Sequence, residues 1–325
     1  MVGKVCGTGS YVPAHYLDND DLSRMVETND AWIQERTGVI RRHIIQEDTT
    51  VSMAAEAARR ALEDGMVSAE EIDLILVTTF TSEVLLPCAA CEVQRELGAV
   101  HATCFDLNAA CTGFVFAWNT AQAYMASGLY RCVLIIGAES LSNFVNWKDR
   151  GTCILFGDGA GAVVLRAEEG ENLPFVTHSD GAKGKALTCL SRHRKGWTAE
   201  QEQQQELENP SFIQMDGQGV FRFAVKKVPE AVDEVLEKAQ MTMEDVDYLI
   251  LHQANRRIEE AVAKRLKTDI GKFPMNLQEY GNTSSASIPI LLDEMNRQGK
   301  LQKGQKLILA GFGAGLSWGA SLVEW

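Results

Sequence analysis

Residues 68–79, Ser-Ala-Glu-Glu-Ile-Asp-Leu-Ile-Leu-Val-Thr-Thr, return 174 positions later as Thr-Met-Glu-Asp-Val-Asp-Tyr-Leu-Ile-Leu-His-Gln at residues 242–253. The same offset joins Asn108-Ala-Ala-Cys111 to Asn282-Thr-Ser-Ser285. Separate blocks that keep one register indicate that a single supersecondary unit has been duplicated. Apolar runs without alternation, such as Leu74-Ile-Leu-Val77, are typical of strands buried on both faces of a sheet.

The two copies predict an α/β protein built from two duplicated halves. We place the halves at residues 1–170 and 171–325, the first with helices over 52–63 and 111–127 and a strand over 133–136. Near the end of the two copies, the offset between matching residues changes by 16. The first half therefore has an extra loop at about 140–154. Two such halves pack around a pseudo-two-fold axis, so the turns that begin at Asn108 and Asn282 are expected to meet at the centre.

The composition of the 325-residue chain narrows the class of protein. It is 46% hydrophobic and 23% charged, which is typical of a globular protein, and its net charge of −13 argues against general affinity for nucleic acid or a membrane surface. Met1–Pro13 contain no signal-peptide run, so a cytoplasmic location is expected. The uncharged segment 307–323 is interpreted as two buried strands around a glycine-rich turn, and the eight cysteines as mostly buried thiols without a disulfide framework.

Three residue types at the predicted centre point to nucleophilic chemistry. Cys111 opens a predicted helix, where the helix dipole and free N–H groups are expected to lower the thiol pKa. His252 ends the strand 248–251, where open α/β sheets place ligands, and Asn282 opens the second central turn. Taken singly, each has a structural interpretation as an inert thiol, a core histidine or a helix cap. Together they provide a nucleophile, an imidazole and an amide donor, which is a set suited to acyl transfer.

Four motifs resemble the β-ketoacyl-acyl carrier protein synthase III family of the thiolase superfamily. They are Asp106-Leu-Asn-Ala-Ala-Cys-Thr-Gly-Phe114, His252-Gln-Ala-Asn255, Tyr280-Gly-Asn-Thr-Ser-Ser-Ala-Ser287 and Gly311-Phe-Gly-Ala-Gly-Leu-Ser-Trp-Gly319. The resemblance covers essentially the whole chain. It implies a thiolase-like fold, a layered αβαβα sandwich, and the initiating condensation of type II fatty-acid synthesis. It implies no resident cofactor or metal, since acyl-CoA and malonyl carrier protein are substrates.

The resemblance also assigns roles to residues. Cys111 would take acetyl or another short acyl group from acyl-CoA, and His252 and Asn282 would stabilise the enolate formed when malonyl carrier protein loses carbon dioxide. The backbone N–H groups of Cys111 and Ala314 would hold the tetrahedral oxyanion, although the family usually has glycine at the latter position.

Two groups of residues match the family's substrate contacts. The coenzyme A contacts would be Trp32, Arg36, Arg150 and Asn255. The basic residues expected to dock an acidic acyl carrier protein are Arg222, Arg256, Arg257, Lys264 and Arg265. A merely solvated helix face remains an alternative for the basic set, and an ordinary helix residue remains one for Trp32.

The chain departs from the family at two further places. Leu86-Pro-Cys88 stands where many members have Phe-Pro-Ser, on a loop that reaches into the partner's acyl pocket of the family's homodimer. The loop 191–210 is longer than usual in the family. Three alternatives stay open: a specialised starter synthase, a hydrolase that releases the acyl group to water, and a non-catalytic scaffold.

Overall fold

A computed structural model of the chain describes residues 1–190 and 212–325, so the loop 191–210 lies outside the described residues. The first of its two main sheets has the strand order β1-β7-β6-β4-β5. β4 is parallel to β5 and β6, whereas β7 is antiparallel to β6 and β1. The bounds of these strands are β1 Val2–Tyr11, β4 Leu74–Thr78, β5 Thr103–Leu107, β6 Cys132–Glu139 and β7 Gly159–Glu168.

The second main sheet repeats this arrangement with one strand fewer. Its order is β11-β12-β13-β8, with β11 parallel to β12 and antiparallel pairing elsewhere. β4, β6 and β7 of the first sheet thus correspond to β11, β12 and β13. β5 has no counterpart in this sheet, because the equivalent stretch ends in the short helix α10. The bounds are β8 Phe175–Ser179, β11 Tyr248–Leu251, β12 Lys306–Gly313, β13 Ser317–Glu324 and α10 Leu277–Tyr280.

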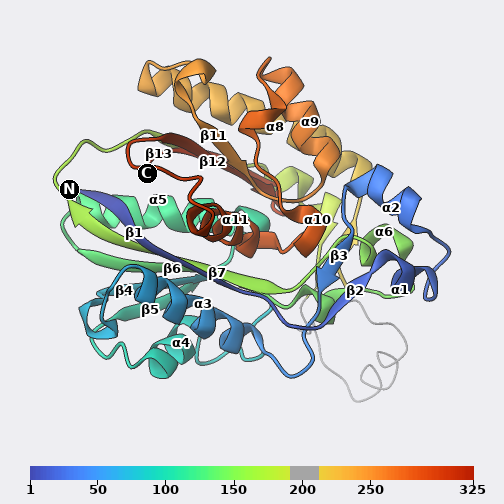
Figure 1. Cartoon of the computed structure of the whole chain (residues 1–325), viewed down its shortest axis with the longest axis horizontal. Helices are drawn as coiled ribbons and strands as arrows, with labels where there is room; N and C mark the ends of the chain where they lie inside the picture. The colour runs from blue at the N-terminus through green and yellow to red at the C-terminus, as the bar shows by residue number, and fades with distance from the viewer. Residues whose placement is uncertain (191–211) are drawn as a thin grey trace.

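Helices form three layers around the two sheets (Figure 1). α5 and α11 lie between the sheets, α3 and α4 cover the outer face of the first sheet, and α8 and α9 lie over the second. The predicted αβαβα sandwich of two repeated halves is confirmed. The bounds are α3 Thr50–Asp64, α4 Ala89–Leu97, α5 Gly113–Ala126, α8 Gly217–Ala239, α9 Arg256–Arg265 and α11 Ser287–Arg297.

Small residues let α3 lie very close to β1. The helix starts at a capping box, in which Thr49 accepts from the Ser52 N–H and the Ser52 hydroxyl accepts from the Thr49 N–H. A side chain at Gly7 or Gly9 would place its Cβ 2.2 Å or 2.3 Å from a carbonyl oxygen of α3. Only glycine permits this contact, which buries the alanine face of the helix against the sheet.

A smaller lobe holds α1 (Asn19–Ser23), α2 (Asp30–Thr37), the β2–β3 pair (Tyr16–Asp18 and Arg41–His43) and α6 (Arg150–Cys153), as Figure 1 shows at one end of the molecule. The fully buried Arg42 ties this lobe together by donating to the Asn19 side chain and to the backbone carbonyl of Ile154, both at 2.9 Å. β9 (Leu187–Thr188) pairs with β10 (Gln214–Met215) nearby.

The connections agree with the predicted asymmetry of the halves. In the first half, residues 140–158 join β6 to β7 and include α6, whereas in the second half residues 314–316 join β12 to β13. The segment 307–323 forms the two buried strands predicted for it. No helix within the described ranges has the length and apolar character of a membrane span.

Candidate active site

Cys111 lies on a sharp turn that the repeat produces twice. The preceding residue, Ala110, has φ 47°, and its counterpart 174 positions later, Ser284, has φ 52°. Both are left-handed conformations that side chains rarely adopt. Each opens a short 3₁₀ turn, Ala110–Thr112 or Ser284–Ala286, which runs into a central helix. The two turns contact each other, as the pseudo-symmetry predicted.

The end of β12 packs directly against Cys111. A Cβ added at Gly313 would lie 3.0 Å from both the N and the Cβ of Cys111, so the close approach depends on glycine. The next residue, Ala314, is held by the hydroxyl of Ser317, which donates to its carbonyl at 3.0 Å and lies 2.8 Å from the Thr112 hydroxyl. Ala314 and Cys111, the proposed pair of oxyanion donors, are therefore close neighbours.

The thiol of Cys111 has a higher pKa than an ordinary cysteine, which contradicts the expected lowering. Burial raises this pKa to about 12, and the buried Glu139 carboxyl acts in the same direction. The Ser284 hydroxyl acts the other way and favours the thiolate. The prediction was wrong because it weighed the helix terminus and left out desolvation, which penalises a charged sulfur enclosed between two halves.

His252 is fixed at the end of β11 by strand and helix neighbours. Its N–H donates to the Ala310 carbonyl at 2.9 Å, and its ring packs edge-on against Phe312 with centroids 5.3 Å apart. The ring Nδ1 lies 2.8 Å from the hydroxyl of Ser287, the first residue of α11. Burial lowers the His252 pKa to about 3, so the imidazole is neutral near pH 7.

Asn282 joins the same centre through the second turn. Its backbone bridges to Phe156 and donates to the Leu155 carbonyl at 2.8 Å, and its side-chain oxygen accepts from the Ser284 N–H at 2.9 Å. Ser284 is in turn the hydroxyl beside Cys111. β12 thus links Cys111 to His252, and Ser284 links Cys111 to Asn282, so the structure brings the three predicted residues together.

Behind the turn lies Glu139, a buried acid that the sequence analysis missed. One carboxyl oxygen accepts from the hydroxyls of Ser284 and Ser285, both at 3.2 Å, and the other accepts from Thr81 at 2.7 Å and from the Phe80 N–H at 3.3 Å. Burial raises its pKa to about 7 despite these donors. A signal was present in the sequence, because Glu139 is the one charged residue of β6 and ends a strand that is otherwise apolar and buried.

The residues expected to hold coenzyme A meet at one place on the small lobe. Arg150 stacks its guanidinium over Trp32, 4.8 Å from the ring centroid, and Arg36 lies 5.8 Å from it. Asn255 joins α9 to α2 by donating to the Arg36 carbonyl at 3.0 Å. An aromatic face, two cations and an amide are suited to an adenine ring and phosphate groups.

The basic residues lie on exposed helix faces. Arg256 is paired with Glu260 at 3.0 Å, and Arg265 lies near Val225 on α8. All five members of the set are exposed: Arg222, Arg256, Arg257, Lys264 and Arg265.

The segment around Leu86 is also exposed. Leu85 and Leu86 are 93% and 86% exposed, and they lead into α4 beside β5, an edge strand of the first sheet. Cys88 and Cys91 follow with their sulfur atoms 3.5 Å apart. Across residues 1–190 and 212–325, no group of three His, Cys, Asp or Glu side chains converges as metal ligands would.

Comparison with known proteins identifies the family. Residues 105–181 match the family described as 3-Oxoacyl-[acyl-carrier-protein (ACP)] synthase III, and residues 236–325 match its C-terminal part. A protein of Clostridium novyi (strain NT) named Beta-ketoacyl-[acyl-carrier-protein] synthase III is 48% identical over 332 residues, which cover 99% of this chain and 98% of that protein.

Solved structures agree with the sequence matches. The 3-oxoacyl-[acyl-carrier-protein] synthase III of Aquifex aeolicus VF5 is 41% identical with a TM-score of 0.92, over 99% of this chain and 100% of that one. The priming beta-ketosynthase of the R1128 polyketide biosynthetic pathway is 35% identical with a TM-score of 0.91, over 99% and 96%. The chain therefore belongs to the 3-oxoacyl-[acyl-carrier-protein] synthase III family and has its thiolase-like fold.

Proposed function

We propose that this protein catalyses the initiating condensation of fatty-acid synthesis, joining a short acyl group from acyl-CoA to malonyl carrier protein. The observation that carries the proposal is one buried centre that contains a thiol, a neutral imidazole and an amide, beside a surface suited to coenzyme A. Cys111, His252 and Asn282 are the proposed catalytic residues.

The first half-reaction transfers the acyl group to sulfur. The Cys111 sulfur attacks the thioester carbonyl and loses its proton, and the tetrahedral oxyanion is held by the N–H groups of Cys111 and Ala314. Collapse expels the coenzyme A thiolate, which takes up a proton and leaves as a free thiol. Because burial disfavours the free thiolate, proton loss is expected to accompany attack rather than precede it.

The second half-reaction forms the carbon–carbon bond. Cleavage of the malonyl carboxylate releases carbon dioxide, and its bonding electrons pass into the thioester as an enolate. Neutral N–H donors from His252 and Asn282 stabilise the enolate oxygen. The carbanion then attacks the acyl carbon on Cys111, the C–S bond breaks, and the sulfur regains a proton as 3-ketoacyl carrier protein departs.

Product analysis tests this reaction. Wild-type protein with acetyl-CoA and malonyl carrier protein should yield 3-ketoacyl carrier protein, carbon dioxide and free coenzyme A in equal amounts. Cys111→Ala should abolish acyl labelling of the protein, and Cys6→Ala, a half-buried thiol on β1, should not. Free acetate as the main product would establish a hydrolase instead, and absence of label on Cys111 would favour a scaffold.

A specialised starter synthase is the second candidate, because a priming synthase of a polyketide pathway shares the fold at 35% identity. A panel of acyl-CoA primers separates the two. Preference for acetyl or a similar short chain supports the primary pathway, whereas exclusive use of a longer or unusual primer supports a specialised one.

The carrier protein is proposed to dock on the basic faces of α8 and α9. Arg257 is exposed and, among the described residues, has no acidic partner, whereas Arg256 is already paired with Glu260. Arg257→Glu should raise the KM for malonyl carrier protein about tenfold and spare acyl transfer from coenzyme A. Lys300→Glu, an exposed lysine beyond α11, is the matched control. Equal loss of both half-reactions would reject the docking role.

The protein is also proposed to act as a homodimer through the first sheet. β5 is an edge strand, and the exposed Val84, Leu85 and Leu86 beside it form an apolar group typical of an interface. Light scattering should give twice the chain mass of 35.8 kDa. Leu85→Asp combined with Leu86→Asp should shift the mass toward the monomer, and a monomeric wild type would contradict the proposal.

A further inference from the structure

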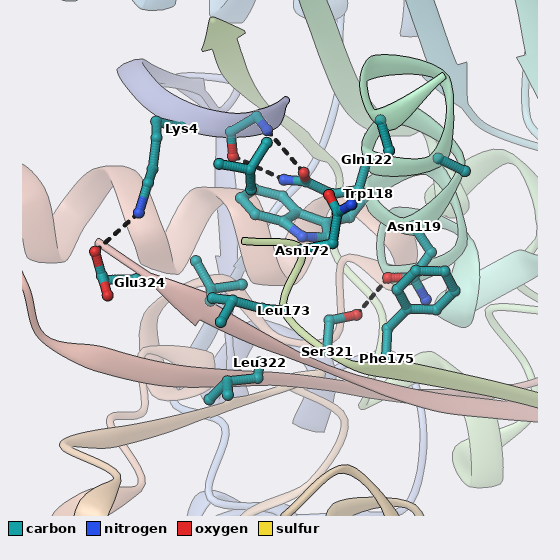
Figure 2. Close-up of a pocket in the computed structure, with 15 residues that line it drawn as sticks. Lys4, Trp118, Asn119, Gln122, Asn172, Leu173, Phe175, Ser321, Leu322 and Glu324 are labelled. Carbon is teal, nitrogen blue, oxygen red and sulfur yellow. Dashed lines mark hydrogen bonds and ion pairs between the residues drawn. The ribbon is translucent and has the colours of Figure 1, made fainter. Parts of the chain in front are cut away.

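The pocket along α5 offers a ligand no free charged group. It has a volume of about 170 Å³ and lies between the later part of α5, the start of β1 and the end of β13 (Figure 2). The two charged residues of its lining, Lys4 and Glu324, are paired at 2.9 Å, and Gln122 exchanges two hydrogen bonds with the backbone of Gly3. A pair of reactive groups outside the proposed active site lies instead at the start of α4, on the outer face of the first sheet (Figure 1).

Cys88 and Cys91 are this pair. Cys88 is the residue before α4, and Cys91 lies in the first turn of the helix, where its N–H donates to the Cys88 carbonyl at 3.0 Å. Residues three apart in such a turn are neighbours on one face of the helix. The two sulfur atoms are accordingly only 3.5 Å apart.

The sheet holds the start of α4, and with it the two thiols, in place. The carboxylate of Asp106 on β5 accepts from the N–H groups of Ala89 and Ala90, both at 2.8 Å. Cys88 and Cys91 are both half-buried, whereas Cys111 is buried. The pair is therefore fixed in position and open to a small reagent.

The separation of the two sulfur atoms is close to that of a disulfide. A disulfide bond is about 2.05 Å long, so the sulfur atoms must approach each other by roughly 1.5 Å, a shift that rotation of the two side chains supplies. Only Ala89 and Ala90 separate the two cysteines in the chain. Each thiol is therefore present at a high effective concentration for the other.

We propose that Cys88 and Cys91 form a thiol–disulfide exchange site whose reaction partner is a low-molecular-weight disulfide. One cysteine loses its proton and attacks the S–S bond of the partner, which forms a mixed disulfide and releases one small thiol. The other cysteine then loses its proton and attacks the mixed disulfide, so that the Cys88–Cys91 bond forms and the second small thiol departs. The pair loses two electrons and two protons, and the partner gains both. Neither sulfur belongs to the proposed catalytic residues, so the proposal is independent of the condensation reaction.

The surroundings of Cys91 slow this exchange without preventing it. The hydrogen bond with Cys88 raises the pKa of the Cys91 thiol, and burial and the charges of Asp106 and Glu92 act in the same direction. The thiolate is the attacking form, so a raised pKa lowers the rate. The extent of oxidation at equilibrium, rather than the initial rate, therefore reports on the geometry of the pair.

Peptide mapping tests the proposal. Trypsin cuts after Arg60 and Arg95, and the peptide 61–95 between them carries Cys88 and Cys91 and no other cysteine. The full chain is equilibrated with an excess of 2-hydroxyethyl disulfide, quenched with acid, and then alkylated with iodoacetamide under denaturing conditions. Most of the peptide should have lost two hydrogen atoms and carry no alkyl group. A peptide with both thiols alkylated, or one joined to the peptide 96–131 that carries Cys104, would overturn the proposal.

Single variants test whether the two sulfur atoms react with each other. In Cys88→Ser and in Cys91→Ser the second step is missing, so the mixed disulfide with the probe should accumulate at least about tenfold more than in the wild type. Cys104→Ser, which removes a half-buried thiol on the neighbouring β5, is the matched control and should leave closure unchanged. Accumulation of the mixed disulfide in the wild type to the level of the two variants would overturn the proposal.

Discussion

The hydroxyl of Ser287 determines which nitrogen of His252 can donate a proton. It accepts from the Gln253 N–H at 3.2 Å and lies 2.9 Å from the Ser284 carbonyl and 2.8 Å from Nδ1 of His252. A neutral imidazole carries one proton. The single hydroxyl proton can go to the Ser284 carbonyl or to Nδ1, and only donation to Nδ1 leaves the ring proton on Nε2, which is the tautomer that stabilisation of an enolate requires.

We therefore predict that Ser287→Ala slows condensation about tenfold to a hundredfold and leaves acyl transfer to Cys111 nearly unchanged. The two half-reactions are measured separately by labelled acyl transfer and by product formation. Nitrogen NMR of the imidazole should show loss of the Nε2–H tautomer. Ser127→Ala, an exposed serine at the end of α5, is the control. Equal slowing of both steps with an unchanged tautomer would show that Ser287 only supports the local structure.

Glu259 is a buried carboxyl without a hydrogen-bond partner among the described residues. Burial raises its pKa well above the usual value. The nearby Gln253 amide, which acts to lower that pKa, donates instead to the Leu251 and Pro274 carbonyls. Burial thus disfavours the charged form of Glu259, and the carboxyl is held at a cost in the apolar layer beneath α9.

Glu259→Leu should increase the free energy of unfolding at pH 8 by about 1–3 kcal/mol, because it removes an unpaired polar group and restores apolar contacts. Urea titration measures the change. The neighbouring Glu260, exposed and paired with Arg256, provides the matched control, and Glu260→Leu should alter stability by less than about 0.5 kcal/mol. A destabilised Glu259→Leu variant would show that the carboxyl has an unseen polar partner.

At the scale of elements, α2 and α6 together form the proposed coenzyme A surface. Trp32 lies on α2, and Arg150 is the first residue of α6, where it also donates to the Glu27 carbonyl at 2.9 Å. The stacked pair has a flat face of the kind that an adenine ring stacks on. Arg150 thus comes from the connection between β6 and β7, which is longer than its counterpart in the second half.

Trp32→Ala should raise the KM for acyl-CoA about tenfold with little change in kcat, because an aromatic face that contacts the nucleotide acts equally in the ground and transition states. Arg150→Ala should act in the same direction. Steady-state kinetics with varied acyl-CoA measure KM and kcat separately. Arg24→Ala, on the loop after α1, is the control. A fall in kcat at constant KM would assign Trp32 to the reacting centre instead.

At the scale of the whole molecule, burial disfavours the charged forms of His252, Glu139 and Glu259 in the folded state. The pKa of His252 falls from 6.5 to about 3, so its contribution to stability is present above pH 6.5 and is lost as the pH falls toward 3. The pKa of Glu139 rises from 4.5 to about 7, so its contribution is complete below pH 4.5 and is lost as the pH rises through 7. Glu259 acts in the same direction as Glu139.

The free energy of unfolding should therefore be greatest between about pH 4.5 and 6.5 and fall on both sides, because a tenfold change in the acid dissociation constant of a group corresponds to about 1.4 kcal/mol. Urea titrations at constant ionic strength from pH 4 to 9 measure this profile. Glu259→Leu should flatten the alkaline side and leave the acidic side unchanged. Stability that rises steadily up to pH 9 would contradict the assignment.

The amino-acid sequence by itself determined the repeat and the main strands and helices within it. Local periodicity and the 174-residue repeat placed β11 at residues 248–251 as found, and they put Cys111 and Asn282 on equivalent turns. These features depend on neighbouring residues in the sequence or on the similarity of the two halves. Both can be recognised in the amino-acid sequence alone.

Only the tertiary structure decided the electrostatics of the proposed site. The pKa of Cys111 and the cluster around Glu139 depend on which groups of one half pack against the other. The missing counterpart of β5 is also a tertiary result, because that stretch forms α10 instead. Desolvation and donor pairing are properties of the packed molecule, and no local pattern of residues specifies them.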